Sequence, residues 1–402
     1  MLNCRISRKW ITCYVPAFGP MQLALVELVL ILLLLAGTRP ALAAAQAPQL
    51  PDLERVGLGE MASFLDELQR QFGTGISDIT LDELLHDPSK VQQFLHPGRL
   101  ASWLWESVWH EVLAARGALG SIAVASILCA LLEVTGLAFG EGASRVGSYA
   151  CFLAIAAVCM AGFNAAFTLI RGSCEKLVAV MKALIPPLIG LVAASGAPVS
   201  AGMLHPLLVS MTYFVAFTFS DYVIPLLFLG GVLDLVSHVS GGIRLGDLSS
   251  LLRQASSFVM GCSLAGFLGV MTVQRAAAGV ADSVALRAAK FMSGTFVPVV
   301  GKMISDAAEL VFLSTHTLRV GAGIVGAVVL VGWAIFPLLK VFLQIAMYRL
   351  VAAVTAACGA EKVASCLNAI ATSLITACVA LGVVTLMFVL SLALVVSAAR
   401  PF

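Results

Sequence analysis

Residues 367–398 read LNAIATSLITACVALGVVTLMFVLSLALVVSA and contain no Asp, Glu, Lys or Arg. A membrane-spanning helix needs about 20 apolar residues to cross about 30 Å of hydrocarbon. This run is longer than one crossing requires, so it predicts a helix that tilts strongly, bends near Gly382 or extends beyond the bilayer. The stretch therefore indicates an α-helical protein that spans a membrane.

The composition of the whole chain supports this interpretation. Of its 402 residues, 60% are hydrophobic and 11% are charged, and the mean hydropathy is +1.00. Soluble domains have on average roughly 45–50% apolar and roughly 25% charged residues. We therefore expect an all-α, polytopic membrane protein whose partner is the lipid bilayer and not a nucleic acid.

Charged breaks divide residues 118–402 into a series of apolar runs. Several prolines between residues 183 and 240 predict helices that kink, break or re-enter the membrane. We expect about seven to nine apolar spans, of which about seven are true crossings. The runs lie at 118–139, 147–170, 183–202, 204–220, 222–238, 254–274, 320–340, 341–358 and 367–398.

Two signals for the orientation of the early spans conflict. Arg171, Lys176 and Lys182 favour a cytoplasmic loop, whereas an exported N-terminus with one crossing per run places the same loop outside. The number of early crossings therefore stays open. Polar residues within the runs are weak functional candidates because they are costly unless paired or hydrated, although proximity to a span end explains most of them equally well. They are Glu133, Asn164, Asp221, Asp234, Lys340 and Arg349.

Small residues near the start of the run at 320–340 have the spacing of closely packed helices. Ala322 and Gly326 are four positions apart. Gly323 and Ala327 have the same spacing, which lets two helix backbones approach closely. We favour ordinary packing within the chain over dimerisation.

Residues 1–45 have the features of a signal peptide or leader. Basic residues precede the apolar run LVLILLLLAG at 28–37, and RPALAAAQA at 39–47 has the small-residue pattern that signal peptidases accept. Cleavage after Ala43 or Ala45 fits this pattern. An uncleaved first transmembrane helix is the alternative.

The next two segments lie before the first long apolar run. Residues 46–98 are acidic, and a capping box formed by Thr80 and Glu83 is one of several helix signals, so we expect a small helical ectodomain. Residues 99–117 contain several Trp residues, whose amphipathic rings favour the membrane surface, which predicts an interfacial helix.

The interval 275–319 is the longest one in which charges recur between two apolar runs. Pro298 cannot continue the upstream hydrogen-bond ladder and Gly294 relaxes the turn, so we expect a helical hairpin that breaks there. Charged residues fall on one side of each predicted helix at about 100° per residue. This polar seam consists of Arg275, Asp282, Arg287, Lys290, Lys302, Ser305, Asp306 and Glu309.

Two interpretations of the polar seam stay open. Lys302 and Asp306 are four residues apart and can pair, but such a pair is worth only about 0.2–0.5 kcal/mol when exposed. On the first interpretation, the charges only face solvent and the hairpin is an amphipathic element on the membrane surface. Alternatively, the seam docks against partner subunits or lines a water-filled conduit, as helical hairpins of transporters do.

Motifs for catalysis are incomplete in this chain. His110 and Glu111 begin a zinc-protease motif, but Ala114 stands where its second His is required. A phosphate loop is excluded by the glycine spacing and by Met303 in place of Ser or Thr. The cysteines in or beside the apolar runs lack metal-ligand spacing and are expected to pack as small hydrophobes. We therefore expect no enzyme, and no catalytic, cofactor-binding or metal-binding residue.

Two stretches carry a resemblance to a known family. VQRAAAGVADSVALRAAKFMSGTFVPVVGKMISDAAELV at 273–311 resembles the hallmark region of the stage III sporulation protein AE family. MKALIPPLIGLVAASGAPVSAGMLHPLL at 181–208 is similar to a second stretch of that family. The order of leader, small ectodomain and polytopic region agrees as well, so the resemblance covers nearly the whole mature chain.

The resemblance implies a role in endospore formation. Members of this family are regarded as mother-cell membrane components of a secretion-like channel that links the mother cell and the forespore. The implied partners are the other stage III sporulation A proteins and stage II sporulation protein Q. On this interpretation the ectodomain lies in the intermembrane space, and the hairpin at 275–319 is a conduit or docking element.

A secondary transporter that acts independently is the alternative function. Spans broken by proline and charges within the membrane are typical of such transporters, and an isolated transporter shows substrate-dependent flux in vesicles. A channel component is expected to be inert when it is alone.

Overall fold

The computed structural model describes residues 141–195, 197–240, 245–296 and 300–397, together with the isolated helical positions 109, 120 and 124. The predicted leader and ectodomain, the interfacial helix except Trp109, and the first span except Gly120 and Val124 lie outside the described residues. In most of the segment 275–319 the description covers the backbone and not the side chains.

The described residues are helical almost throughout and contain no β-strand, which confirms the all-α class. Only a few residues separate most of the helices, whereas α8, η3 and α9 follow one another without a break. The elements are α7 (Glu141–Ala194), α8 (Pro198–Ala216), the π-helix η3 (Phe217–Val223), α9 (Ile224–Ser240), α10 (Gly246–Phe296), α11 (Val300–Ala357) and α12 (Glu361–Ser397).

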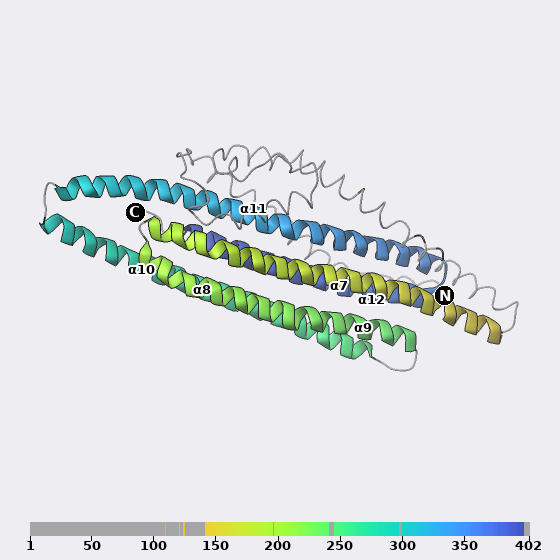
Figure 1. Ribbon diagram of the computed structural model, residues 1–402. Helices are drawn as coiled ribbons and strands as arrows, with labels where there is room; N and C mark the ends of the chain where they lie inside the picture. The colour runs from red at the N-terminus through yellow and green to blue at the C-terminus, as the bar shows by residue number, and fades with distance from the viewer. Residues whose placement is uncertain are drawn as a thin grey trace, which may run out of the picture.

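The helices form an elongated bundle of antiparallel rods (Figure 1). Helix α7 is followed by the combined rod α8–η3–α9, which returns along it, and then by α10, α11 and α12 in alternating directions. The second half of α10 and the first half of α11 extend past the ends of α7, α8 and α12 at the left of Figure 1. Among the described residues, five helices are long and apolar enough to cross a membrane.

Helix α12 lies at the centre of this bundle, where it contacts α7, α9, α10 and α11. Its side chains are buried along almost its whole length, including Leu374, Leu381, Val384 and Phe388, each at most 1% exposed. Since α12 has no charged residue after Lys362, it can be enclosed by other helices without burying a charge. The apolar run that indicates the fold class is therefore the core helix.

The structure corrects the division of the apolar runs into separate helices. The runs 147–170 and 183–202 are joined by α7, which continues to Ala194. The runs 204–220 and 222–238 likewise form one rod, and α11 contains 320–340 and all of 341–358 except its last residue. The charged residues between these runs did not end the helices because Lys, Arg and Glu favour helix formation.

The prolines have different effects along the bundle. Pro186 and Pro187 lie inside α7 and Pro206 lies inside α8, so these helices continue through them. Pro198 is the first residue of α8, a position that needs no backbone N–H. Pro225 is the second residue of α9, just after η3, where the wider π-helical turn interrupts the regular hydrogen-bond ladder.

Glycines allow the helices to approach closely. A Cβ added at Gly231 of α9 would clash with the Phe163 ring of α7, and one at Gly323 of α11 would clash with Val396 of α12. At Gly326 an added Cβ would lie 3.1 Å from Leu184 and 3.3 Å from Leu392. The small residues of α11 therefore pack within the chain, which confirms the interpretation that we favoured over dimerisation.

The turn between α11 and α12 depends on Gly359, which has a φ of 96°. The Gly359 N–H donates to the Ala356 carbonyl at 3.0 Å, and the Ala360 N–H donates to the Thr355 carbonyl at 3.2 Å. This pair of bonds is the Schellman motif, which satisfies the last carbonyl groups of a helix and favours glycine at this position. The tight turn holds α12 directly beside α11.

Candidate functional site

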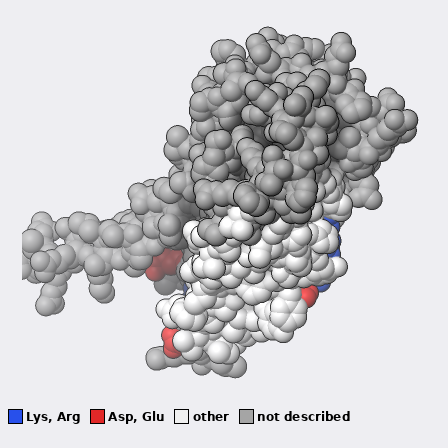
Figure 2. All heavy atoms as spheres, turned by 90° about the vertical axis from the view of Figure 1, so that its left-hand side faces the viewer, with Lys and Arg blue, Asp and Glu red and all other residues white. Residues whose placement is uncertain are grey.

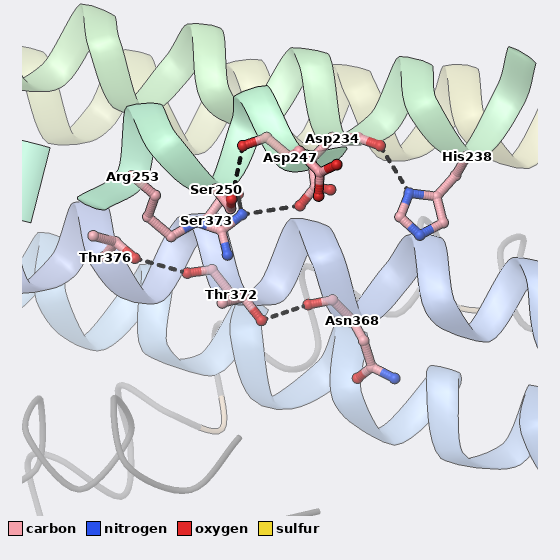
Figure 3. Close-up of polar contacts among 9 residues, drawn as sticks. All are labelled: Asp234, His238, Asp247, Ser250, Arg253, Asn368, Thr372, Ser373 and Thr376. Atoms are coloured by element: carbon pink, nitrogen blue, oxygen red, sulfur yellow. Dashed lines mark hydrogen bonds and ion pairs between the residues drawn. The ribbon is translucent and has the colours of Figure 1, made fainter. Parts of the chain in front are cut away.

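An ion pair inside the bundle is the best-defined polar site of the described helices. Arg253 of α10 donates from Nη2 to Oδ2 of Asp234 on α9 at 2.9 Å (Figure 3). The same guanidinium lies 3.4 Å from the hydroxyl of Ser373 on α12. The Asp234 side chain is 15% exposed and that of Arg253 is 26% exposed. One arginine thus connects three helices at a partly buried point.

The other polar groups around the ion pair are bonded within their own helices. His238 Nδ1 donates to the Asp234 carbonyl at 2.7 Å, which fixes its tautomer because a carbonyl only accepts. Thr372 donates to the Asn368 carbonyl at 2.8 Å, and Thr376 donates to the Thr372 carbonyl at 3.1 Å. Of the contacts drawn in Figure 3, only those of Arg253 join different helices.

The sequence places this ion pair in the apolar parts of two candidate spans. Asp234 belongs to the span Pro198–His238, and Arg253 belongs to Gly246–Gln274. An ionised group is costly in such surroundings unless a partner of opposite charge compensates it. The pair can therefore act as a structural link between α9 and α10, or as a charge site within a transport path.

A second polar contact joins α11 to α7. Gln344 Nε2 donates to the Gly162 carbonyl at 3.0 Å and lies 3.3 Å from the hydroxyl of Tyr348. Gly162 permits this contact because a Cβ at that position would clash with the Tyr348 hydroxyl. Phe163, the next residue, packs on Gly231, one turn before Asp234. The Gln344–Gly162 contact and the Asp234–Arg253 pair therefore lie close to each other along the long axis of the bundle.

Sequence analysis identified only part of this site. Asp234 was among the weak candidates, because it interrupts an apolar run. Arg253, Gln344 and Ser373 were missed. Arg253 directly precedes the run 254–274, a position that is typical of charged residues at the end of a membrane span. Nothing local indicates its partner, which lies 19 residues earlier in the chain.

The predicted polar seam falls on α10 and α11. Arg275, Asp282, Arg287 and Lys290 belong to α10, whereas Lys302, Ser305, Asp306 and Glu309 belong to the first turns of α11. Helix α10 continues through Gly294 and ends at Phe296, and α11 begins at Val300. Pro298 and the side chains of the seam lie outside the described residues, so the seam stays a prediction.

The described side chains do not form a metal-binding group. In that part of the chain no three His, Cys, Asp or Glu residues are placed to hold a metal ion. The seven cysteines described there, from Cys151 to Cys378, are free thiols. The Asp234–Arg253 pair and the Gln344 contact are therefore the polar groups on which the functional argument rests.

Comparisons with known proteins identify the family. The model of the family described as stage III sporulation protein AE matches residues 79–399. Stage III sporulation protein AE of Bacillus subtilis (strain 168) is 31% identical over 347 residues, which cover 86% of this chain and 86% of that protein. No solved structure matches the chain. The chain therefore belongs to the stage III sporulation protein AE family.

Proposed function

We propose that this protein is a subunit of a secretion-like channel complex that links the mother cell and the forespore during endospore formation. The observation that carries this proposal is the family match over residues 79–399. Because that match includes all five apolar rods, the sporulation role belongs to the membrane bundle itself. The protein acts in the mother-cell membrane around the forespore, with its N-terminal ectodomain in the intermembrane space, and it has no catalytic activity.

The bundle suits a role as a scaffold within a larger complex. Its central helix is enclosed, and the Arg253 contacts join α9, α10 and α12. The C-terminal end of α10 and the N-terminal end of α11 extend beyond the other helices, where another subunit could contact them (Figure 1). We propose that the seam of the 275–319 hairpin binds partner subunits or lines the conduit. The partners are the other stage III sporulation A proteins and stage II sporulation protein Q.

Deletion of the gene tests the proposal. We expect engulfment of the forespore to be completed and the engulfed forespore then to stall or collapse, with a large loss of heat-resistant spores. Fluorescence microscopy of the membranes and spore counts after heating measure both effects. Normal spore yield would contradict the sporulation role. A block before engulfment would contradict the channel role and leave the family assignment intact.

A secondary transporter is the second candidate function. The Asp234–Arg253 pair favours it, because charged pairs within apolar helices often mark substrate or proton paths. The transporter hypothesis predicts substrate-dependent flux in vesicles that contain this protein alone, and that flux should be lost in Asp234→Asn. The channel proposal predicts no flux until the partner subunits are added.

A further inference from the structure

The rods of this bundle are much longer than a bilayer is thick. The candidate span Tyr149–Ala194 has 46 residues and Pro198–His238 has 41. At 1.5 Å per residue the first of these is about 69 Å long, against about 30 Å of hydrocarbon. Tilt alone would have to exceed about 60°, whereas membrane helices tilt by about 0–40°. A part of the bundle must therefore lie outside the hydrocarbon.

A group of charged and aromatic side chains crosses the bundle in the second half of α7. Lys176 Nζ lies 4.5 Å from the centre of the Trp333 ring of α11, and Lys182 Nζ lies 4.4 Å from that of Tyr213 on α8. The Ser220 hydroxyl of η3 bonds to Cys174 at 3.7 Å, which places Asp221 at the same height. The group, called here the inner belt, consists of Arg171, Glu175, Lys176, Lys182, Tyr213, Asp221 and Trp333.

The inner belt interrupts a surface with few charges. Arg171 and Glu175 pair at 3.2 Å, each 56% exposed, and Asp221 is exposed as well. Figure 2 shows the described surface from the end at the left of Figure 1, mostly uncharged, with blue and red atoms gathered at its edges. Exposed charges halfway along apolar rods are unfavourable in lipid but favourable at headgroup level, where Lys and aromatic rings are enriched.

A second group of this kind lies at the opposite end of the rods. Lys362 Nζ lies 5.9 Å from the centre of the Tyr149 ring. Glu361 begins α12 next to Lys362. Tyr149, Glu361 and Lys362 are called the outer belt.

The distance between the two belts matches one bilayer. Tyr149 and Lys176 lie about 40 Å apart along α7, and a bilayer with its headgroups is about 40–45 Å thick. On α7 no Asp, Glu, Lys or Arg lies between Arg145 and Arg171. The large exposed hydrophobic side chains within this interval include Leu153, Val158, Leu350 and Val354. Exposed polar side chains on α7 in the same interval, Asn164 and Thr168, are uncharged.

The remaining length of the bundle does not provide a second membrane interval. Beyond Lys182, α7 continues only to Ala194, which is about 18 Å and too short to cross. At this end α10 and α11 carry the charges of the 275–319 hairpin. Helix α12 carries no charged residue at the height of the inner belt. Because its neighbours enclose it, α12 does not contact the lipid headgroups and needs no polar residue there.

We propose that the phospholipid headgroup layer of one membrane face binds the inner belt, and that the bilayer covers the bundle only from the inner belt to the outer belt. The rest of the bundle, from about residue 183 on α7, stands in the aqueous phase with the α10–α11 hairpin at its far end. The Asp234–Arg253 pair then lies within the bilayer. This placement goes beyond the proposed channel role and does not depend on it.

The depth of four exposed positions tests this placement. An environment-sensitive fluorescent amino acid replaces Leu153 or Leu350 between the belts, and Val199 or Met203 beyond the inner belt. These side chains are 53%, 67%, 37% and 43% exposed, respectively. Each full-length variant is reconstituted into vesicles of phosphatidylethanolamine and phosphatidylglycerol with iodide on both sides, or into vesicles that contain doxyl-labelled lipid. Circular dichroism and size-exclusion chromatography confirm that each variant is folded.

We expect iodide to quench the probes at 199 and 203 several-fold more than doxyl lipid does. The probes at 153 and 350 should show the reverse order. Lipid quenching at 199 and 203 would overturn the proposal, because the bilayer would then extend past the inner belt. Quenching by neither agent at these two positions would overturn it as well, because protein and not water would cover this half. Iodide quenching at 153 and 350 would contradict the placement of the membrane interval.

Discussion

Arg253 and Asp234 face each other from adjacent antiparallel helices, with 2.9 Å between guanidinium nitrogen and carboxylate oxygen. The pair is partly buried in an apolar bundle, and Arg253 reaches on to Ser373 of the central helix. Because only a few residues separate the end of α9 at Ser240 from the start of α10 at Gly246, the pair fixes the register of the two helices near these ends.

We expect Asp234→Ala to destabilise the bundle, because it leaves the Arg253 charge without its carboxylate. The loss should lie between the about 0–1 kcal/mol of a surface pair and the about 3–5 kcal/mol of a buried pair. Thermal unfolding in detergent, followed by circular dichroism, measures it. Glu175→Ala is the matched control, since it removes a carboxylate whose pair with Arg171 is 56% exposed on both sides.

The double variant Asp234→Ala, Arg253→Ala distinguishes the interaction free energy of the pair from the contribution of each residue alone. If the charges interact, the double variant should be less destabilised than the sum of the two single variants. Additive effects would contradict the assignment of this pair as a structural link.

We expect Gly231→Ala to lower the unfolding temperature, because the added Cβ would displace the Phe163 ring from its packed position. Phe163 is 2% exposed and lies 4.6 Å from Phe167 and 5.5 Å from Phe228, measured between ring centres. Overpacking of such a site costs typically about 1–3 kcal/mol. Gly190→Ala is the control, because no atom lies within 4 Å of its added Cβ, and alanine there should stabilise the helix slightly. Equal effects of both substitutions would contradict the close packing of α7 and α9.

We expect Gly359→Ala to destabilise the α11–α12 turn by roughly 1–2 kcal/mol, because an L-residue with a side chain is strained at a φ of 96°. The measurement is chemical unfolding of the purified protein in detergent. Gly172→Ala lies in a regular helix with nothing within 4 Å of the added Cβ, so it should not reproduce this loss. A neutral result at Gly359 would mean that the turn can adopt another conformation.

We expect Lys302→Glu to reduce heat-resistant spore yield and the capture of partner proteins, because it reverses a charge in the predicted seam of the 275–319 hairpin. The chromosomal variant is scored by spore counts and by affinity capture from sporulating cells. Lys302→Arg keeps the charge and should retain both functions. Unchanged yield and capture in Lys302→Glu would mean that the seam is only a solvated helix face.

The class of the fold could be predicted from the sequence because it depends on composition and on the length of apolar runs. The charge-free run at 367–398 became α12, which spans Glu361–Ser397. The boundaries between helices were less predictable. Charged residues such as Arg171 and Lys182 suggest loops between spans, but they are also compatible with a helix that leaves the membrane. The structure shows that α7 continues through these residues, with Lys176 packed on Trp333 and Lys182 on Tyr213.

The candidate site was less predictable than the fold. Asp234 attracts attention because a carboxylate within an apolar run needs a partner. Its partner depends on how two helices pair in space, which no local pattern of Arg253 reveals. The π-helix η3 was not predicted either, since its residues Phe217–Val223 have no distinctive sequence signal. The polar seam of the hairpin stays a prediction based on helical periodicity.

The central position of α12 has a consequence for biosynthesis. The helix that fills the middle of the bundle is synthesised after all the other described helices. Until α12 has been made, α7, α9 and α11 lack the surface against which they pack, so these earlier helices stay in an open arrangement. A chain cut short before Glu361 would keep most of its length and lose its core, and membrane proteases that recognise open helices would be expected to degrade it.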